Sequence, residues 1–201
     1  MKDQILNKAT ELFLNQGFKS ITMDDIAQQM AISKKTIYSH YGNKEAIVRA
    51  STHHVFTAIC TGIDHICALQ KNPIVELYDV KKYVLEHLKG DRTSPMYQLQ
   101  KYYPKIHSEL LLKRFEYMQD CVIQNVERGL AEGLFRENID VGFVSRIYFV
   151  GITGIKDLEI FPMDHFPSTA LHDMFLEYHL RGIVTPKGRK VLNALIHSNQ
   201  E

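Results

Sequence analysis

Two helix-start signals placed eleven residues apart constrain this chain more than any other feature. Thr22 and Ser33 both suit the N-cap position, where a side-chain oxygen accepts a hydrogen bond from a backbone N–H of the first turn. An isoleucine precedes each cap and another follows four residues after it, which is the spacing of a hydrophobic staple. Two short helices are therefore expected, with only Ala31 and Ile32 left to form the turn between them.

Helices this short are not stable alone in water, so they must pack against a neighbour. An apolar stripe at Ile5, Leu6, Ala9, Leu12 and Phe13 predicts a preceding helix. Gly17 suits the left-handed residue that ends such a helix. We expect Leu12 and Phe13 to meet Ile26 and Ile37 in one small core. Three helices with a tight turn before the last are typical of a helix-turn-helix.

The outward side of the third helix suggests the function. Its first turn carries two lysines beside free backbone N–H groups and the positive end of the helix dipole, which favours phosphate. Lys35 suits guanine O6 and N7, and Thr36 a thymine methyl group. The residues after them suit phosphate contacts, although a capped, solvated surface helix would explain the composition equally well. The candidate DNA-binding residues are Thr22, Ser33, Lys34, Lys35, Thr36, Tyr38, Ser39, His40, Tyr41 and Lys44.

The same stretch resembles the DNA-binding unit of the TetR family of transcriptional regulators. The resemblance lies in the pattern T-M-x-x-I-A-x-x-x-x-I-S-x-x-T-I-Y-x-x-Y-x-x-K-E-A-I and in the preceding ATELFLNQGFKSIT. Two positions depart from the family pattern. Ala31 replaces the usual turn glycine, so the turn is expected to use an ordinary backbone conformation or to carry some strain. Lys35 stands where a small residue is common, and we expect it to set this protein's own operator preference.

Helical spacing continues through the remaining chain, and no alternating strand pattern is present. Long helices are predicted at 44–70, 105–131, 140–160 and 168–184. Shorter ones are predicted after Asn72, between the loop at 90–95 and Pro104, and from Pro186. We therefore expect an all-α chain of about nine helices. Residues 1–46 would form the helix-turn-helix domain, and residues 47–201 a larger helical domain.

Composition limits other functions. The net charge is +1, and residues 1–50 hold seven Lys/Arg and five Asp/Glu, so DNA binding must rest on a local patch that a dimer duplicates. The three cysteines Cys60, Cys67 and Cys121 fit a reducing compartment. Their spacing is explained by burial as well as by a metal site, so no metal or cofactor is predicted. A helix pattern starting at Asp3 and the lack of a long apolar run predict a cytoplasmic protein without a signal peptide or membrane span.

An enzyme would need a recognisable constellation of catalytic residues. His107 with Glu109, and His53 with His54, match no G-x-S-x-G, H-E-x-x-H or phosphate-loop pattern. These histidines are better explained as solvent-facing helix residues, so we expect no enzymatic activity.

The resemblance implies a homodimer that binds palindromic operator DNA, with a small-molecule pocket in the larger domain. Apolar helices at 140–160 and 168–184 fit a dimer face or a monomer core, and the resemblance favours the dimer. The candidate interface residues are Phe143, Ile147, Gly151, Ile155, Leu171, Phe175 and Tyr178. Aromatic and Met side chains in the middle of the chain fit an apolar pocket or ordinary core. The candidate ligand residues are Tyr83, His87, Tyr97, Tyr102, Tyr103, Phe115, Met118 and Phe149.

The expected function is repression relieved by a largely apolar ligand. The ligand would stabilise a dimer spacing that is incompatible with DNA, and the helix from residue 44 to 70 would carry the change. Control by a protein partner in place of a ligand is the alternative.

Overall fold

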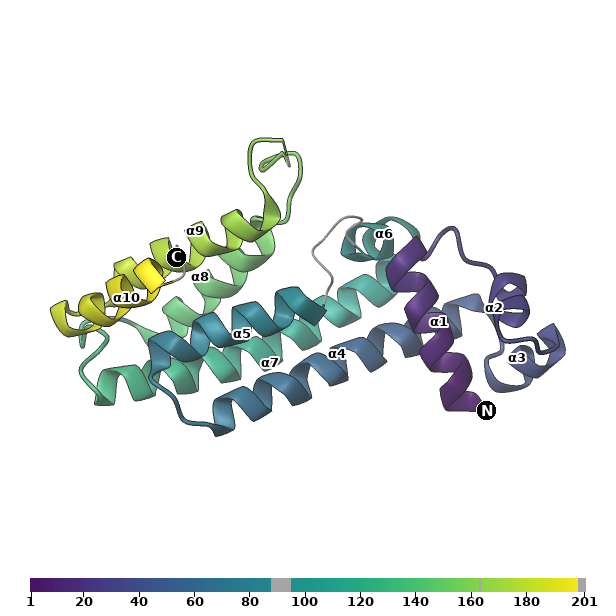
Figure 1. Cartoon of the computed structure of the whole chain (residues 1–201), viewed down its shortest axis with the longest axis horizontal. Helices are drawn as coiled ribbons and strands as arrows, with labels where there is room; N and C mark the ends of the chain where they lie inside the picture. Colours follow the sequence, from purple (N-terminus) through teal and green to yellow (C-terminus); the bar gives the residue numbers. More distant parts are fainter. Residues whose placement is uncertain (88–94, 163, 199–201) are drawn as a thin grey trace. The chain divides into compact units, whose positions relative to one another are not determined.

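The computed structural model describes residues 1–87, 95–162 and 164–198, and within these ranges the fold is all-α. The prediction of an all-helical chain is confirmed, with ten helices in the described residues where about nine were expected (Figure 1). The helices are α1 Lys2–Gln16, α2 Met23–Gln29, α3 Lys34–His40, α4 Lys44–Ala68, α5 Pro73–His87, α6 Pro95–Tyr102, α7 Pro104–Ala131, α8 Val141–Gly154, α9 Ser168–Ile183 and α10 Pro186–Ser198. Residues 90–94 of the predicted loop lie outside the described residues.

The structure divides into two compact units. The first unit contains α1–α3, α4 up to Thr61, α6 and the start of α7 up to Lys113. The second contains α4 from Gly62, α5 and the chain from Arg114 onward. The first unit thus includes more of the chain than residues 1–46. An independently folding domain with that boundary stays a prediction.

The core of the first unit is the one expected from the apolar stripe. Leu12, Phe13, Ile26 and Ile37 are all buried in a single cluster, which confirms the predicted contacts between α1, α2 and α3. The cluster also contains side chains from α4, α6 and α7, among them Leu99. Burial of this apolar surface supplies the stability that the short helices lack by themselves.

Gly17 ends α1, but not in the left-handed helical conformation that was expected. Its φ of 88° and ψ of 155° lie in a region that is almost restricted to glycine. A Cβ atom at this position would lie 2.3 Å from the side-chain amide nitrogen of Gln98 on α6. The Lys19 N–H donates to Oε1 of the same glutamine at 3.4 Å. Helix α6 therefore packs directly on the turn between α1 and α2.

The second unit has its own core, formed by α5 and α7–α10. Leu176, Leu180 and Leu192 are fully buried there, together with Phe135, which forms an isolated antiparallel bridge with Val184. Helix α8 ends at Gly154, six residues earlier than predicted. The chain after it forms turns, in which the Asp157 side chain accepts from the Glu159 N–H at 2.9 Å. None of the described helices is both long and apolar enough to cross a membrane.

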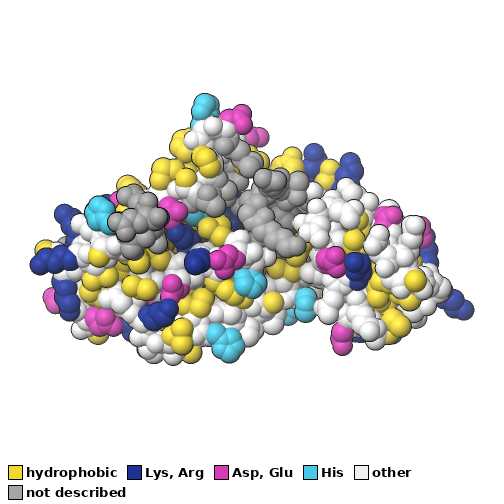
Figure 2. All heavy atoms as spheres, in the orientation of Figure 1, with side chains coloured by type: hydrophobic (Ala, Val, Ile, Leu, Met, Phe, Trp, Pro, Cys, Tyr) yellow, Lys and Arg dark blue, Asp and Glu magenta, His cyan; other side chains and the backbone are white. Residues whose placement is uncertain are grey.

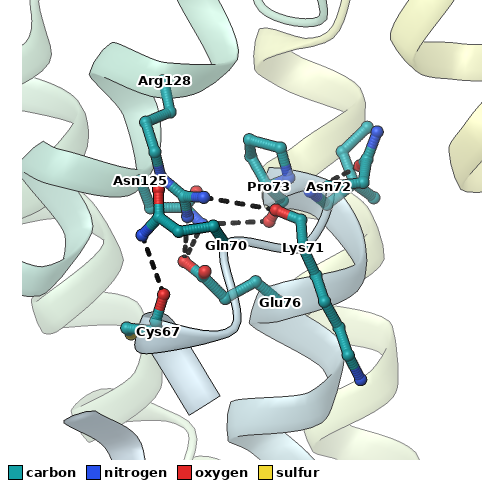
Figure 3. Close-up of polar contacts among 9 residues, drawn as sticks. Cys67, Gln70, Lys71, Asn72, Pro73, Glu76, Asn125 and Arg128 are labelled. Carbon is teal, nitrogen blue, oxygen red and sulfur yellow. Dashed lines mark hydrogen bonds and ion pairs between the residues drawn. The ribbon is translucent and has the colours of Figure 1, made fainter. Parts of the chain in front are cut away.

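A buried polar cluster fixes the turn between α4 and α5 (Figure 3). The side-chain amide of Asn125 on α7 donates to the Pro73 carbonyl at 3.0 Å and to the Glu76 carboxylate at 2.8 Å. Arg128 pairs with the same carboxylate and donates to the Lys71 carbonyl at 3.2 Å. Because the carbonyls of Lys71 and Pro73 accept these bonds from α7, the turn is held against that helix.

Candidate nucleic-acid interface

Helix α2 begins with the cap expected at Thr22, and the partner is Asp25. The Thr22 hydroxyl accepts from the Asp25 N–H at 3.2 Å and donates to the Asp25 carboxylate at 2.7 Å. The Thr22 N–H donates to the same carboxylate at 2.7 Å, which completes a capping box. Hydrogen bonds from the Thr22 backbone and side chain, with the nearby charge of Lys44, lower the pKa of Asp25. The Thr22 side chain is thus engaged within the protein, and its predicted DNA contact stays a prediction.

Helix α3 begins in the same way at Ser33. Its hydroxyl oxygen accepts from the Thr36 N–H at 3.1 Å, and the two hydroxyl oxygens lie 2.8 Å apart. The Ser39 hydroxyl donates back to the Thr36 carbonyl at 2.7 Å. The isoleucines that flank each cap pack on the core of the first unit, with Ile32 partly buried. The caps and staples read from the sequence are therefore present in the structure.

The turn between α2 and α3 places Ala31 in a left-handed conformation with a φ of 52°. The Ala31 N–H donates to the Gln28 carbonyl at 3.1 Å, and the Ile32 N–H to the Ala27 carbonyl at 3.0 Å. These bonds close the tight turn that a helix-turn-helix requires. An L-residue with a side chain is strained by roughly 1–2 kcal/mol in this conformation. Of the two expectations for Ala31, the structure shows the strained turn.

The exposed cations of α3 have different surroundings. Lys34 forms an ion pair with Asp24 of α2, with Nζ 2.9 Å from Oδ2, and the hydrogen bond to Asp24 raises the pKa of Lys34. Lys35 is exposed, and no ion pair is found for it among the described residues. Tyr38, which is 43% exposed, lies on the outer side of the same helix, and His40 is exposed as well. Lys35 is therefore the more available of the two lysines for an anionic ligand.

Tyr41 differs from its expected place on the exposed face. It is only 6% exposed and belongs to the core of the first unit. The reason is that α3 ends at His40, and the extended backbone at Tyr41, with φ −134° and ψ 109°, no longer follows the helix. Burial raises the pKa of Tyr41, and the ammonium of Lys2 lies 5.9 Å from its ring centroid. Exposure of Tyr41 was thus wrongly predicted.

Lys44, at the start of α4, is also engaged within the protein. Its ammonium donates to the Lys19 carbonyl at 3.2 Å, in the turn between α1 and α2. Partial burial lowers the pKa of Lys44, and the charge of Asp25 opposes this effect. Lys44 therefore ties α4 to the same turn that α6 contacts through Gln98. Its predicted contact with phosphate would require this hydrogen bond to be shared or exchanged.

One residue of this surface, Asp24, was not predicted from the sequence. Its carboxylate lies beside Lys34 and partly neutralises the charge that was assigned to phosphate. The sequence shows two adjacent acidic residues in the first turn of α2, where their negative charges interact favourably with the positive end of the helix dipole. Their distance from α3 depends on the angle at which α2 and α3 pack, and this angle could not be derived from the sequence.

The predicted ligand residues fall into both units. Tyr97, Tyr102 and Tyr103 belong to the first unit, where Tyr103 packs edge-on to Phe18 with ring centroids 6.4 Å apart. The Lys19 ammonium lies 5.2 Å from the Tyr102 ring centroid. Tyr102 and Tyr103 therefore contact the turn between α1 and α2.

In the second unit, two pairs of the predicted ligand residues are in contact. The rings of Tyr83 and His87 lie 4.0 Å apart on α5, and those of Phe115 and Phe149 lie 5.1 Å apart between α7 and α8. Met118 of α7 packs on the core of this unit. A ligand site at these residues stays a prediction.

The predicted dimer residues also divide into two groups. Phe143, Ile147 and Tyr178 are exposed, together with Val150 and Met174. Ile155 and Leu171, in contrast, are 8% and 7% exposed and pack inside the chain, so the structure does not place them on a free face.

The other two predicted dimer residues, Gly151 and Phe175, pack against each other within one chain. Phe175 of α9 lies over Gly151 of α8, where a Cβ atom would approach its ring to 2.1 Å. Gly151 is therefore needed for the packing of α8 on α9 within one chain. Gly151 was among the candidate dimer residues, and a role of it in a dimer stays a prediction.

No ring of candidate metal ligands appears in the part of the chain that the structure describes, where no three His, Cys, Asp or Glu side chains are grouped for an ion. Two buried histidines lie in the second unit. His179 packs between Tyr148 and Phe175, with ring centroids 5.1 and 5.9 Å away. Burial lowers the pKa of His179 to about 4. It is therefore a neutral core residue at neutral pH.

Comparison with known proteins agrees with this geometry. Residues 5–51 match the model of the family described as bacterial regulatory proteins, tetR family. The chain is also 43% identical over 56 residues to the biofilm operon icaADBC HTH-type negative transcriptional regulator IcaR of Staphylococcus epidermidis. That match covers only 28% of this chain and 30% of the relative.

Solved structures extend the likeness of fold to most of the chain. A transcriptional regulator of the TetR family from Agrobacterium tumefaciens has a TM-score of 0.71 and 19% identity, with 92% of this chain and 97% of that chain covered. A transcriptional regulator from Cytophaga hutchinsonii has a TM-score of 0.74 and 15% identity, with 91% and 98% covered. Residues 5–51 therefore form a helix-turn-helix of the tetR family of bacterial regulatory proteins, and most of the chain shares the fold of these solved regulators.

Proposed function

We propose that this protein is a sequence-specific DNA-binding transcriptional repressor that acts as a homodimer. The observation that carries the proposal is the exposed first turn of α3, where the Lys35 side chain is exposed on a capped helix-turn-helix. In this kind of unit the N-terminal residues of the second helix contact base edges in the major groove. Repression is the sense that we favour because the related IcaR is named a negative regulator.

The weak net charge of the chain supports a dimer. At +1, one chain has little long-range attraction for DNA, so affinity must come from a local patch that is used twice. Two-fold symmetry would place two copies of α3 on successive turns of a palindromic operator. The exposed apolar side chains of α8 and α9 offer a self-complementary face for this dimer. We define this α8–α9 face by Phe143, Ile147, Val150, Met174 and Tyr178.

We further propose that a small, largely apolar ligand lowers the affinity for DNA. Half-buried aromatic side chains on α5, α7 and α8, including Tyr83, Phe115 and Phe149, support this class of ligand. A response to ligand requires a difference in ligand affinity between the DNA-competent state and another state.

Selection of bound duplexes from a random DNA pool tests the proposal. We expect the purified full chain to enrich an inverted repeat. Binding should weaken steeply with salt, because lysine–phosphate contacts release counterions. The double substitution Lys34→Ala and Lys35→Ala should reduce the affinity at least about tenfold and flatten the salt dependence. Lys82→Ala, which removes an exposed lysine from α5, is the matched control and should leave both unchanged.

Two results would contradict the proposal: no enriched sequence, or equal losses in the double variant and the control. The selected duplex then serves to find the effector. Apolar and aromatic compounds are screened for release of the protein from labelled DNA, and a strongly anionic natural effector would contradict the proposed ligand class.

A further inference from the structure

The charges of this protein are divided unequally between its two compact units. In the described residues, the first unit has ten Lys/Arg and six Asp/Glu, a net charge of +4, whereas the second has twelve and fifteen, a net charge of −3. The +1 of the whole chain therefore conceals a basic unit, and this unit contains the helix-turn-helix. Three of its lysines lie on α6 and the start of α7. A basic surface outside the helix-turn-helix can attract a polyanion as well.

Two lysines of the first unit form a surface patch with two tyrosines of α6. The Lys19 ammonium lies 5.2 Å from the centroid of the Tyr102 ring. The Lys101 ammonium lies 5.7 Å from the same centroid and 5.8 Å from that of Tyr97. All four side chains are exposed, Tyr97 by 58% and Tyr102 by 37%. Figure 2 shows Lys or Arg side chains next to yellow ones over α6, which Figure 1 labels. We call these four residues the α6 patch.

The chemistry of the α6 patch suits a phosphate backbone. A lysine ammonium has three N–H donors, so a ring on one side leaves donors for an anion on the other. Lysine and tyrosine side chains are both common partners of DNA phosphate. In the part of the chain that the structure describes, no ion pair joins Lys19 or Lys101 to a carboxylate. Lys34, in contrast, is paired with Asp24.

The α6 patch adjoins residues that are candidates for contact with the operator. Lys19 precedes Thr22, the N-cap of α2, by three residues, and its carbonyl accepts from the Lys44 ammonium at 3.2 Å. Its N–H donates to the Gln98 side chain at 3.4 Å, so α6 is held beside the turn that leads into α2. A DNA strand that reaches Thr22 and Lys44 would therefore meet the α6 patch next.

We propose that the α6 patch binds the sugar-phosphate backbone of the DNA that flanks each operator half-site. The contact recognises no base, because ammonium and phenol groups meet phosphate oxygens. It adds affinity to a site whose sequence is selected by α3. The inference rests on the proposed DNA-binding function. The charge of the first unit and the bond between Lys44 and Lys19 carry it.

The test uses two duplexes that contain the inverted repeat selected by the purified full chain. One ends at the outer edges of the repeat, and the other continues on each side for about ten base pairs of arbitrary sequence, one helical turn. Lys19→Gln with Lys101→Gln removes both charges of the patch, and Lys19→Arg with Lys101→Arg keeps them. Lys82→Gln, on α5 in the second unit, is the control for the loss of an exposed lysine.

We expect the wild type to bind the long duplex at least about fivefold more tightly than the short one at low salt, because more phosphates are neutralised. The glutamine variant should lose this gain and bind the short duplex like the wild type. On the long duplex, up to four phosphate contacts per dimer are lost, so the slope of log affinity against log salt should fall by about two to four. The arginine variant and the control should keep the gain, and all variants should keep the wild-type circular dichroism.

Equal affinity of the wild type for both duplexes, or a gain that the glutamine variant keeps, would overturn the flanking contact. Specific binding to the short duplex would still support DNA reading through α3. An equal loss on both duplexes would mean that the two lysines act on the helix-turn-helix itself, which also contradicts the flanking contact. If the selection enriches no sequence, the proposed function fails and the inference fails with it.

Discussion

Lys34 and Asp24 form an ion pair between α3 and α2, with 2.9 Å between the ammonium nitrogen and the nearer carboxylate oxygen. Both side chains are exposed, so the pair adds little to stability. It matters more for function, since a DNA phosphate must compete with Asp24 for the same ammonium. Asp24 also places a negative charge next to the surface that is proposed to meet DNA.

Asp24→Asn should therefore tighten DNA binding. The change frees Lys34 and removes repulsion from phosphate in both subunits, and we expect a gain of about three- to tenfold at low salt that shrinks as salt is raised. Fluorescence anisotropy with the selected duplex measures it. Asp79→Asn is the matched control, because it also removes a Lys–Asp ion pair, that with Lys71, from α5. Weaker binding of the Asp24→Asn variant would show that the pair is needed to orient α3.

Ala31→Gly should stabilise the protein. Glycine adopts a φ of 52° without strain, and the gain should exceed the extra entropy of glycine in the unfolded chain, leaving about 0.5–1 kcal/mol. Urea unfolding followed by circular dichroism gives the free energy of unfolding. Ala58→Gly, inside α4, should instead destabilise by about 1 kcal/mol. A loss of stability at both positions would mean that Ala31 is not strained.

Gly17→Ala should destabilise the first unit by about 1–3 kcal/mol, since alanine is strained at this φ and ψ and its Cβ would meet Gln98. Combining it with Gln98→Ala removes the clash but leaves the backbone strain, so the double variant should recover only part of the loss. Thermal unfolding of the two single variants and the double variant separates these contributions. Full recovery in the double variant would assign the whole effect to the clash.

His179 should make the stability depend on pH in the acid range. Its folded pKa of about 4 lies below the ordinary value of 6.5, so the unfolded chain binds a proton first as pH falls. The contribution of neutral His179 to the free energy of unfolding is complete above pH 6.5 and is lost as pH falls toward 4. This loss lowers the free energy of unfolding by at most about 3 kcal/mol. Chemical unfolding at several pH values should show this slope, and His179→Phe should flatten it. An unchanged slope in the variant would contradict the burial of a neutral histidine.

The local signals of the sequence predicted the N-terminal unit well. Caps at Thr22 and Ser33, and the apolar positions of α1–α3, act through neighbours within a few residues, so their geometry could be derived without the rest of the fold. The same holds for proline at the start of α5 and for the break before Pro104. The early end of α8 was missed because its apolar residues continue past Gly154, where turn bonds at Asp157 replace the helix.

The details of the candidate sites depended on contacts between distant segments. The burial of Tyr41 follows from the end of α3 and the position of the core. The bond between Lys44 and the Lys19 carbonyl, and the pair between Lys34 and Asp24, depend on how helices cross. Tyr102 and Tyr103 were assigned to a ligand pocket by composition, and the structure places Tyr103 against Phe18. Periodicity gives a residue's side of a helix but not the neighbour it meets.

Methylation protection of guanine N7 on the selected duplex tests the central claim most directly, because this atom lies in the major groove. The wild-type dimer should protect guanines in both half-sites, about one helical turn apart. Lys35→Ala should lose protection at one symmetric pair of guanines, whereas Lys82→Ala should keep the full pattern. Protection that is identical in the wild type and in Lys35→Ala, or confined to a single half-site, would contradict a dimer that reads DNA through α3.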